Sequence, residues 1–574
     1  MPLPPKPVMS APRPAEAGRP PRGSSKVATP HLLESRRALL IGGAGLLTLL
    51  PAAQALAADA AASAASDATT EPALDPRLRE QSHTTHGVVQ VQGRRIEYRA
   101  VAGLLPVEGS HDEPGAVMSY VAYFGKAAPG AAQRPVIFLY NGGPGSSTVW
   151  LHLGAFGPKR VLTGNGRRGP AAPYRLVDNE YSLLDVADLV FIDAPGTGFG
   201  RIVAVDRDKA KEREKLKEKE KEFWGTDQDA AAFARFIKKF LTRFKLWNAP
   251  RYLFGESYGT TRSAVLVQRL QSQESVDMNG VILLSQVLNF GFSADDPQDS
   301  PGNDLAYALA VPTYAATAWY HRRLPAWADR SARTLDQLVA AARRFALGEY
   351  LQALTAGNAI APETRRAVAE TLSGFIGLPA PYLERAALRV YGGMFCNQLL
   401  ADAGLTVGRL DTRYTGPSLD PLAKEADYDP QSSAIESAYV SLYNDYARNT
   451  LEVGADLDYR ASADVGETWD SRHRPPGARQ ARSGTLNVMP DLATAMLVDP
   501  RLKVSMHAGY FDLATPFFAA EYELNHLPIP AALAANIEVH HYPAGHMMYD
   551  DPASLAALHD NVARFVRATD NART

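Results

Sequence analysis

The chain has 574 residues, of which 46% are hydrophobic and 21% charged, and its formal net charge is -2 at pH 7. This length fits one large domain with an insertion or several ordinary domains, and the near-neutral charge gives no electrostatic reason to expect a nucleic-acid partner. No stretch interleaves basic and aromatic residues as a nucleic-acid groove requires. The single cysteine, Cys396, excludes an intrachain disulfide and a cysteine metal cluster, so we expect it to be a buried small hydrophobic residue.

A targeting signal precedes the predicted fold. Arg36 and Arg37 stand before an apolar run at 38–50, and a small-residue cleavage site follows at 55–57. The arginine pair and the glycine-diluted run favour a bacterial twin-arginine signal over the general secretory route. The run is shorter than the roughly 20 residues that span a bilayer, so no stable membrane anchor is expected. We therefore predict a periplasmic or secreted protein whose mature chain begins near Ala58.

Alternating and continuous apolar runs then predict a sheet. Alternation flanks a hairpin signal at Gln92 and Gly93, and a continuous run at 136–140 is expected of a strand buried on both faces. Apolar residues at spacings of three and four between 233 and 244 predict a helix before the next strand, at 251–254. Strand, helix and strand in this order imply parallel pairing, which is typical of an α/β fold.

Two further segments differ from this pattern. Residues 207–222 mix charges of both signs, which indicates a solvated helix or a flexible loop. Residues 293–486 are alanine-rich with helical periodicity, so we expect a helical cap inserted between the sheet-forming parts. The predicted organisation is a disordered N-terminus, signal peptide and linker at 1–67, a core formed by 68–292 and 487–574, and the cap between the two core segments.

The sequence GESYG at 255–259 matches the G-x-S-x-G pattern of a nucleophile elbow. A predicted strand precedes it and a predicted helix follows it, which is the context that such an elbow needs. The two glycines leave room for a tight turn that lifts the hydroxyl of Ser257 clear of the sheet. Ser257 is therefore the candidate nucleophile.

An activated serine needs a general base, and the base needs a carboxylate that holds its tautomer. In the α/β-hydrolase order the acid and then the histidine follow the serine. Asp512 closes the segment VSMHAGYFD and His546 follows the next predicted strand, so both emerge where open α/β sheets place their chemistry. His526, His540 and His541 are competing candidates for the base. His546 is favoured over them because it lies in a loop after a predicted strand.

Four ordered blocks resemble the serine carboxypeptidase family, namely NGGPGSS at 141–147, GESYG at 255–259, AGYFDLATPF at 508–517 and PAGHMMYDDPASLAAL at 543–558. The resemblance covers both sheet-forming parts of the chain. It implies an α/β-hydrolase fold with a mostly parallel central sheet, no metal, no cofactor, and release of single C-terminal residues from a peptide substrate.

The resemblance also implies a complete site, which consists of a catalytic triad, two backbone oxyanion donors and two residues that bind the substrate's terminal carboxyl group. Carried onto this sequence, these residues are Ser257 as nucleophile, His546 as base and Asp512 as orienting acid, the N–H groups of Gly143 and Tyr258 as oxyanion hole, and Asn141 with Glu256 for the carboxyl group. We expect them to meet at one edge of the sheet.

Two residues depart from the family's pattern. Ser146 stands where the family has a disulfide-bonded cysteine, which weakens a structural expectation and leaves the chemistry intact. Ala155 stands where the family carries a glutamate that helps to hold the terminal carboxyl group. Two alternatives therefore stay open: an exported esterase or acyltransferase that uses the same triad on a small acyl substrate, and a non-catalytic binding protein on a hydrolase scaffold.

Overall fold

The computed structural model describes residues 75–571 except 110–112, 127–132, 205, 207 and 421. The predicted twin-arginine signal, its cleavage site and the linker lie outside the described residues. Within the described part of the chain, no helix combines the length and the apolar character that a bilayer crossing requires.

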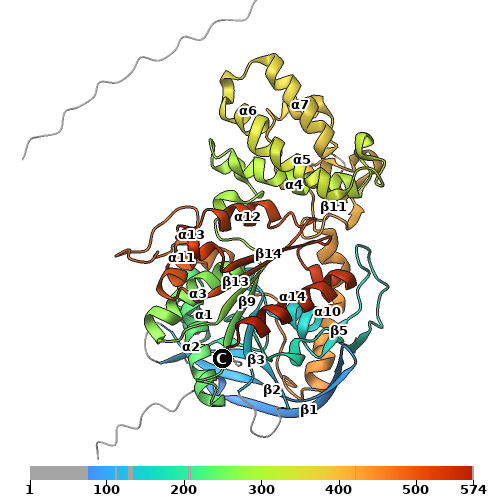
Figure 1. The fold of residues 1–574 in the computed structure, drawn as a ribbon. Coiled ribbons are helices and arrows are strands. Elements are labelled where there is room, and N and C mark those ends of the chain that lie inside the picture. The colour runs from blue at the N-terminus through green and yellow to red at the C-terminus, as the bar shows by residue number, and fades with distance from the viewer. Residues whose placement is uncertain are drawn as a thin grey trace, which may run out of the picture. The chain divides into compact units, whose positions relative to one another are not determined.

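A ten-stranded sheet forms the centre of the fold (Figure 1). Its strands follow the order β1-β2-β3-β7-β4-β9-β10-β13-β14, and the short β8 pairs with β3. β1, β2 and β3 pair in antiparallel fashion. The neighbours β7, β4, β9, β10, β13 and β14, in this spatial order, pair in parallel, which confirms the predicted α/β class. The strands of this sheet are β1 (Gln81–Val91), β2 (Arg94–Glu108), β3 (Pro114–Gly125), β4 (Val136–Tyr140), β7 (Asp188–Ile192), β8 (Arg201–Ile202), β9 (Arg251–Glu256), β10 (Gly280–Leu284), β13 (Lys503–Gly509) and β14 (Ile537–Tyr542). Two separate pairs are β5 (Lys159–Val161) with β6 (Leu176–Asp178) and β11 (Leu405–Val407) with β12 (Thr415–Pro417).

The apolar runs of the sequence account for the central strands. Every residue of β4, β7 and β10 is buried, as expected of strands that helices cover on both faces. The run at 136–140 is β4, as predicted. The turn between β1 and β2 places Gln92 and Gly93 at φ values of 46° and 79°, which confirms the predicted hairpin.

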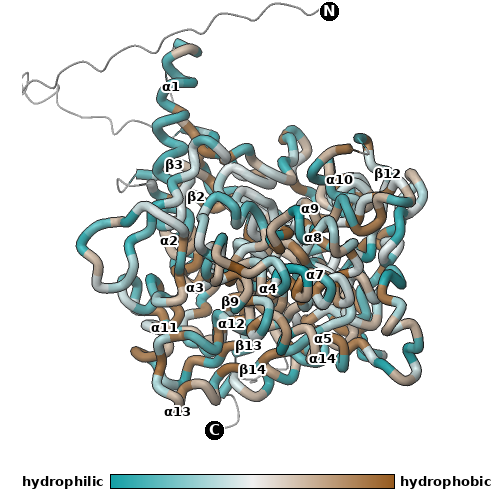
Figure 2. Tube along the Cα trace, turned by 90° about the horizontal axis from the view of Figure 1, so that it is seen from above, coloured by the Kyte–Doolittle hydropathy of each residue, from teal (hydrophilic) through white to brown (hydrophobic). Residues whose placement is uncertain are grey.

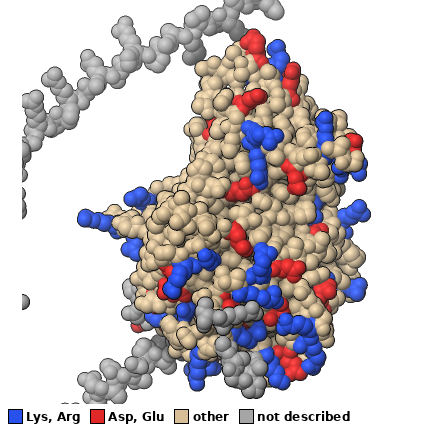
Figure 3. Space-filling view, viewed as in Figure 1, with Lys and Arg blue, Asp and Glu red and all other residues tan. Residues whose placement is uncertain are grey.

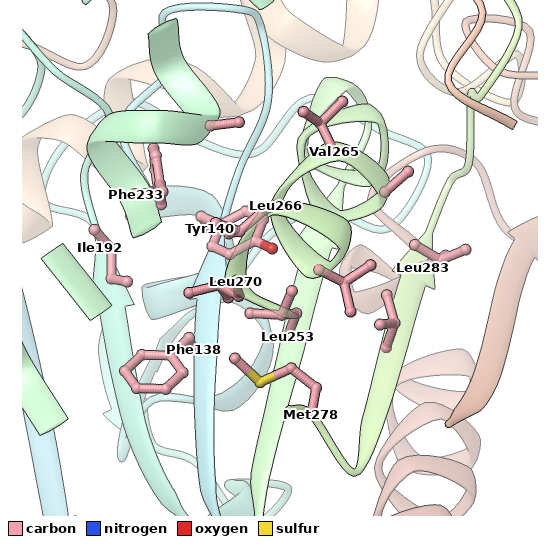
Figure 4. Close-up of a cluster of buried hydrophobic side chains, with 14 of the residues drawn as sticks. Phe138, Tyr140, Ile192, Phe233, Leu253, Val265, Leu266, Leu270, Met278 and Leu283 are labelled. Carbon is pink, nitrogen blue, oxygen red and sulfur yellow. The ribbon is translucent and has the colours of Figure 1, made fainter. Parts of the chain in front are cut away.

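Helices cover both faces of the sheet. α2, α3, α11 and α12 pack on one face. Figure 4 shows side chains of α2 and α3, such as Phe233 and Leu266, close to strand residues such as Phe138 and Leu253. α10 and α14 pack on the other face. The helices are α1 (Lys209–Glu220), α2 (Thr226–Phe244), α3 (Tyr258–Glu274), α4 (Leu305–Tyr320), α5 (Leu335–Phe345), α6 (Leu351–Thr355), α7 (Pro362–Ile376), α8 (Ala380–Arg385), α9 (Gly392–Gln398), α10 (Pro430–Asn449), α11 (Met489–Val498), α12 (Phe517–Asn525), α13 (Ala531–Ala534) and α14 (Pro552–Thr569).

Helices α4 to α9 pack around a hydrophobic core of their own, which includes Tyr314 and Leu338. In Figure 1 the labelled helices α4 to α7 form the upper part of the molecule. Cys396 is buried in this lobe, as predicted, and burial raises the pKa of its thiol. α10 lies in the same inserted segment, 293–486, but packs on the sheet through residues such as Ile435. The inserted segment therefore contributes to the sheet's own core as well as to the lobe.

The charged run at 207–222 contains α1, which has no buried residue. Asp208 caps the helix because its carboxylate accepts hydrogen bonds from the backbone N–H groups of Ala210 (2.8 Å) and Lys211 (3.4 Å). Figure 2 shows this hydrophilic helix standing out from the body of the molecule. Figure 3 shows basic and acidic side chains interspersed over the visible surface. The charged run is thus a solvated helix, one of the two predicted outcomes.

Candidate active site

Ser257 lies at the turn where β9 ends and α3 begins. Its backbone adopts φ 61° and ψ -129°, a conformation that non-glycine residues seldom adopt and that a nucleophile elbow imposes. The turn is so tight that a Cβ on Gly255 would lie 2.1 Å from the carbonyl oxygen of Gly259, and a Cβ on Gly259 would lie 2.9 Å from that of Tyr140. Both glycines of the motif are therefore required by close packing.

Asp512 and His546 meet beyond the carboxyl ends of β13 and β14. His546 Nδ1 lies 2.8 Å from Asp512 Oδ2. Thr515 donates to the same carboxylate from its hydroxyl (2.7 Å) and from its backbone N–H (3.0 Å). Burial opposes a charge on the imidazole, but Asp512 and Glu256 outweigh it and raise the pKa of His546. This geometry allows Asp512 to hold the tautomer with the proton on Nδ1, so that Nε2 is available as a base.

One cleft of about 300 Å³ contains most of the predicted site. Ser257 and His546 line it together with Asn141, Gly143 and Glu256. These residues come from segments that follow β4, end β9 or follow β14, so the carboxyl ends of three parallel strands deliver them to one edge of the sheet. The structure thus brings the predicted nucleophile, base and carboxyl-binding residues together.

The three competing histidines lie against aromatic rings outside this cleft. The ring pairs are His526 with Tyr522, His540 with His507 and His541 with Tyr510, at centroid distances of 3.8, 5.1 and 5.5 Å. None of the three histidines is among the described residues that line the cleft beside Ser257. The geometry therefore favours His546 as the base.

The two predicted oxyanion donors come from neighbouring segments. Tyr258 is the first residue of α3, and the first N–H groups of a helix have no acceptor within it. Gly142 packs so closely on this helix start that a Cβ would lie 2.4 Å from the backbone nitrogen of Tyr258. Gly143 follows with φ 101°, in the region that glycine favours. The close approach places the loop that contains Gly143 next to the backbone of Tyr258, and Gly143 itself lines the cleft.

A buried ion pair anchors the loop that carries Asn141. Arg262 of α3 places Nε 2.5 Å from Asp229 Oδ2 of α2, and its Nη1 donates to the backbone carbonyl oxygen of Asn141 (2.7 Å). The side-chain oxygen of Asn141 accepts a hydrogen bond from the backbone N–H of Leu151 (3.1 Å). Because a buried charge needs its partners, these contacts tie the Asn141 loop to both helices beneath it.

Glu256 is a buried carboxyl group beside the candidate nucleophile, with 2% of its surface exposed. The hydroxyl of Tyr549 lies 3.1 and 3.0 Å from its two oxygens. Burial raises the pKa of Glu256 to about 7, with a smaller contribution from Asp512, and His546, Tyr549 and Asn141 act in the opposite direction. Glu256 can therefore carry a proton in neutral and acidic solution, and a protonated carboxyl group can donate a hydrogen bond to an anion.

Tyr549 packs against Gly154, the residue before Ala155, where the resemblance leads us to expect a second glutamate. The chain around Ala155 is a wide helical turn, Leu151–Phe156. A Cβ on Gly154 in this turn would lie 2.5 Å from the ring of Tyr549 and 2.6 Å from the hydroxyl of Tyr439. Tyr549 thus lies next to the turn that holds Ala155 and also makes a hydrogen bond to Glu256. The sequence did not single out Tyr549, although this residue lies three positions after His546, within the block at 543–558.

The segment 409–412, which we call the brace, belongs to the predicted insertion but is hydrogen-bonded to the catalytic loops. The backbone N–H of His546 donates to the carbonyl oxygen of Leu410 (2.7 Å). The backbone N–H of Thr412 donates to the carbonyl oxygen of Phe511 (3.0 Å), next to the candidate acid. The brace therefore holds the acid loop and the base loop together.

Two charged side chains of the inserted segment also line the cleft, and sequence reasoning missed both. Arg409 of the brace is exposed, and its Nε lies 2.8 Å from Asp295 Oδ1. Glu436 of α10 is exposed on another side of the cleft. No local pattern marks either residue, because both reach the cleft only through the packing of distant segments.

Comparisons with known proteins find one family model that matches part of this chain. A family model described as serine carboxypeptidase matches residues 92–311. The matched segment contains the predicted nucleophile, both oxyanion donors and both carboxyl-binding residues, and it ends before the predicted acid and base. No curated protein matches the chain with significance.

Several solved structures resemble this one. A prohormone-processing carboxypeptidase from Saccharomyces cerevisiae is 15% identical, with 86% of this chain and 93% of that chain covered and a TM-score of 0.47. A proline iminopeptidase from Mycobacterium smegmatis is 14% identical, with 82% and 100% covered and a TM-score of 0.33. A haloalkane dehalogenase variant from Bradyrhizobium elkanii is 13% identical, with 86% and 98% covered and a TM-score of 0.29.

Proposed function

We propose, on the premise that residues 92–311 belong to the serine carboxypeptidase family, that this hydrolase releases C-terminal residues from peptides through an acyl-enzyme on Ser257. The observation that carries the proposal is the combination in one cleft of a strained elbow serine, a carboxylate-supported histidine and a buried carboxyl group. The first two perform acyl transfer, and the third recognises the free end of a peptide.

In the proposed reaction, Ser257 Oγ attacks the carbonyl carbon of the last peptide bond while His546 Nε2 takes the hydroxyl proton. The negative charge that develops on the carbonyl oxygen is stabilised by the N–H groups of Gly143 and Tyr258. His546 returns the proton to the departing amine, which leaves as the free C-terminal residue. A water molecule then attacks the acyl-enzyme with His546 again as base, and Asp512 holds the imidazole throughout.

Glu256 would give the enzyme its preference for a free carboxyl terminus. A carboxylate of the substrate can bind beside Glu256 only when Glu256 carries a proton, because two like charges in contact cannot both stay ionised. The hydroxyl of Tyr549 makes a hydrogen bond to the carboxyl group of Glu256. The proposal therefore links substrate recognition to the pKa of about 7 of Glu256.

The test compares kcat/KM for a peptide with a free C-terminal carboxyl group and for its amide, at pH 6 and pH 8. Ionisation of His546 affects both substrates and cancels in the ratio. Since Glu256 loses its proton as the pH rises through about 7, we expect the acid-to-amide ratio to fall on the order of tenfold between the two pH values. Glu256→Ala should erase the discrimination, and Glu256→Gln, which donates at every pH, should retain it without the pH dependence.

Tyr549→Phe is the matched variant that keeps the ring and removes only the hydroxyl. The hydrogen bond from Tyr549 lowers the pKa of Glu256, so its loss should move the fall in the acid-to-amide ratio to higher pH. An acid-to-amide ratio near one in the unmodified enzyme at both pH values would refute carboxypeptidase activity. Hydrolysis of short acyl esters under the same conditions would then identify an esterase or acyltransferase that uses the same triad.

We also propose that the protein is exported through the twin-arginine route, on the support of the sequence at 36–57 alone. Replacing Arg36 and Arg37 together by lysine keeps the charge and removes the address that the receptor reads. We expect the double variant to accumulate as a precursor in the cytoplasm, measured by fractionation and immunoblotting. Normal appearance of this variant outside the cytoplasm would point to the general secretory route instead.

A further inference from the structure

We propose that the protein has a second binding site, for an anion of the phosphate class, in a cavity of about 540 Å³ formed by α2, α3 and the loop that precedes α11. No residue that lines this cavity also lines the cleft that contains Ser257. Three arginines converge on it, namely Arg235 from α2, Arg269 from α3 and Arg474 from the loop. The proposed site is thus separate from the proposed peptidase chemistry and does not depend on it.

The guanidinium groups of two of these arginines have no internal partner among the described residues. Arg235 Nη1 donates to the carbonyl oxygen of Glu108 (2.8 Å). In the described part of the chain, the guanidinium groups of Arg269 and Arg474 have no hydrogen-bond or ion-pair partner, and the Nε of Arg269 is buried without an acceptor. A buried N–H without an acceptor costs about 1–3 kcal/mol, so a ligand that supplies the acceptor gains affinity at this point.

The arginines also repel one another. Burial lowers the pKa of Arg269, and the positive charges of Arg235 and Arg474 lower it further, while Glu274 and Asp227 compensate in part. Guanidinium groups that lie close together attract an anion, and here the three carboxylates that line the same cavity, Glu222, Asp227 and Asp491, offset part of their charge. The charge arrangement therefore points to a ligand with more than one negative charge.

The carboxylates around the cavity are already engaged. Asp227 lies with Oδ1 2.6 Å from His473 Nδ1 and accepts the backbone N–H of Arg474 at Oδ2 (3.0 Å). Asp491 Oδ2 lies 2.9 Å from the other nitrogen of His473. Glu222 pairs with Lys219 at 3.2 Å.

His473 adds a further positive charge. Burial opposes its protonation, but the hydrogen bonds to Asp227 and Asp491 outweigh burial and raise the pKa of His473 to about 9. The imidazole is therefore charged at neutral pH and neutralises part of the two carboxylates that contact it. With His473 charged, four cationic side chains (Arg235, Arg269, Arg474 and His473) face the three lining carboxylates, which leaves one positive charge in excess.

The shape of the donors favours phosphate chemistry. A guanidinium group is planar and can donate two parallel hydrogen bonds to a pair of phosphate oxygens. Two guanidinium groups from different elements can therefore bind one tetrahedral phosphate from two sides. Gln228 and Gln268 add neutral amide groups to the wall. The volume exceeds that of a single phosphate, so we assign the site to pyrophosphate or to a phosphate ester whose organic part fills the remainder.

Isothermal titration calorimetry of the full chain at constant ionic strength tests the assignment, with pyrophosphate, glycerol 2-phosphate and citrate as probes. We expect pyrophosphate and glycerol 2-phosphate to bind, and Arg269→Gln and Arg474→Gln each to weaken binding by tenfold or more. Arg479→Gln is the control, because Arg479 is exposed in the same loop and does not line the cavity. If pyrophosphate binds and glycerol 2-phosphate does not, the site is assigned to inorganic pyrophosphate, the other ligand named above.

A purely structural role for the arginines predicts a different result. Since the guanidinium group of Arg269 has no hydrogen-bond partner among the described residues and lies near two other arginines, Arg269→Gln should leave the melting temperature of the ligand-free protein unchanged or raise it, while reducing the increase that pyrophosphate causes. A lower melting temperature without ligand, unchanged pyrophosphate affinity in both variants, or equal binding of citrate would each overturn the assignment to a phosphate site.

Discussion

Ser257→Ala is expected to abolish hydrolysis while leaving the protein folded. The serine hydroxyl is the group that forms the acyl-enzyme in the proposed reaction, so its loss should lower kcat on the order of 10⁴- to 10⁶-fold. Alanine keeps the Cβ at the strained elbow and creates no core cavity, and the free energy of unfolding should change by less than about 1 kcal/mol. Initial rates with a free-acid peptide and a thermal melt of the same sample measure both quantities.

Ser432→Ala is the matched control for this variant. Ser432 of α10 lines the same cleft, and its backbone N–H, not its side chain, makes the hydrogen bond to Asp429. We expect the control to retain activity within a few-fold. Activity of Ser257→Ala equal to that of the unmodified enzyme would contradict the assignment of the nucleophile, whatever the substrate.

The second large effect is expected at the acid and the base. His546→Ala should be about as damaging as loss of the serine, because it removes the group that accepts the hydroxyl proton in the proposed reaction. Asp512→Asn keeps the shape of the acid but favours the wrong tautomer of the imidazole, which should lower kcat on the order of 10³- to 10⁴-fold. The structure adds that Thr515 can still donate its backbone N–H to the remaining carbonyl oxygen at position 512, so the acid loop should stay folded.

His541→Ala separates the base from its nearest competitor. His541 stacks on Tyr510 and does not line the cleft, so its loss should affect stability more than turnover. Rates of both histidine variants should be measured at a temperature well below either melting transition. An inactive His541→Ala beside an active His546→Ala would show that the wrong histidine has been assigned.

Those parts of the fold that depend on local patterns could be predicted from the sequence. The five-residue apolar run of β4 follows from burial on both faces, and the elbow at Ser257 follows from two glycines whose missing side chains the turn requires. Ser257, Asp512 and His546 each follow a predicted strand. Because the carboxyl ends of parallel strands lie at the same edge of a sheet, the sequence could place these three distant residues at one edge.

The rest could not be predicted, because it depends on contacts between distant segments. Tyr549 approaches Glu256 because the helical turn after His546 packs against the end of β9, and a tyrosine three residues after a histidine does not by itself indicate such a contact. The brace lies in a segment whose periodicity indicates helix. α10 has the same alanine-rich, helical character as the lobe, and only its contacts, such as those of Ile435, show that it covers the sheet.

The hydrogen bonds of the brace determine how this protein could be re-engineered. Replacing the whole inserted segment, 293–486, by that of another hydrolase would remove the carbonyl group of Leu410 that receives the N–H of His546. Junctions before α4 and after α9 would instead exchange the lobe alone and leave 409–412 in place. The unit that can be exchanged is therefore smaller than the insertion. Chimaeras with junctions at 293 and 486 should form the sheet but leave Asp512 and His546 misaligned.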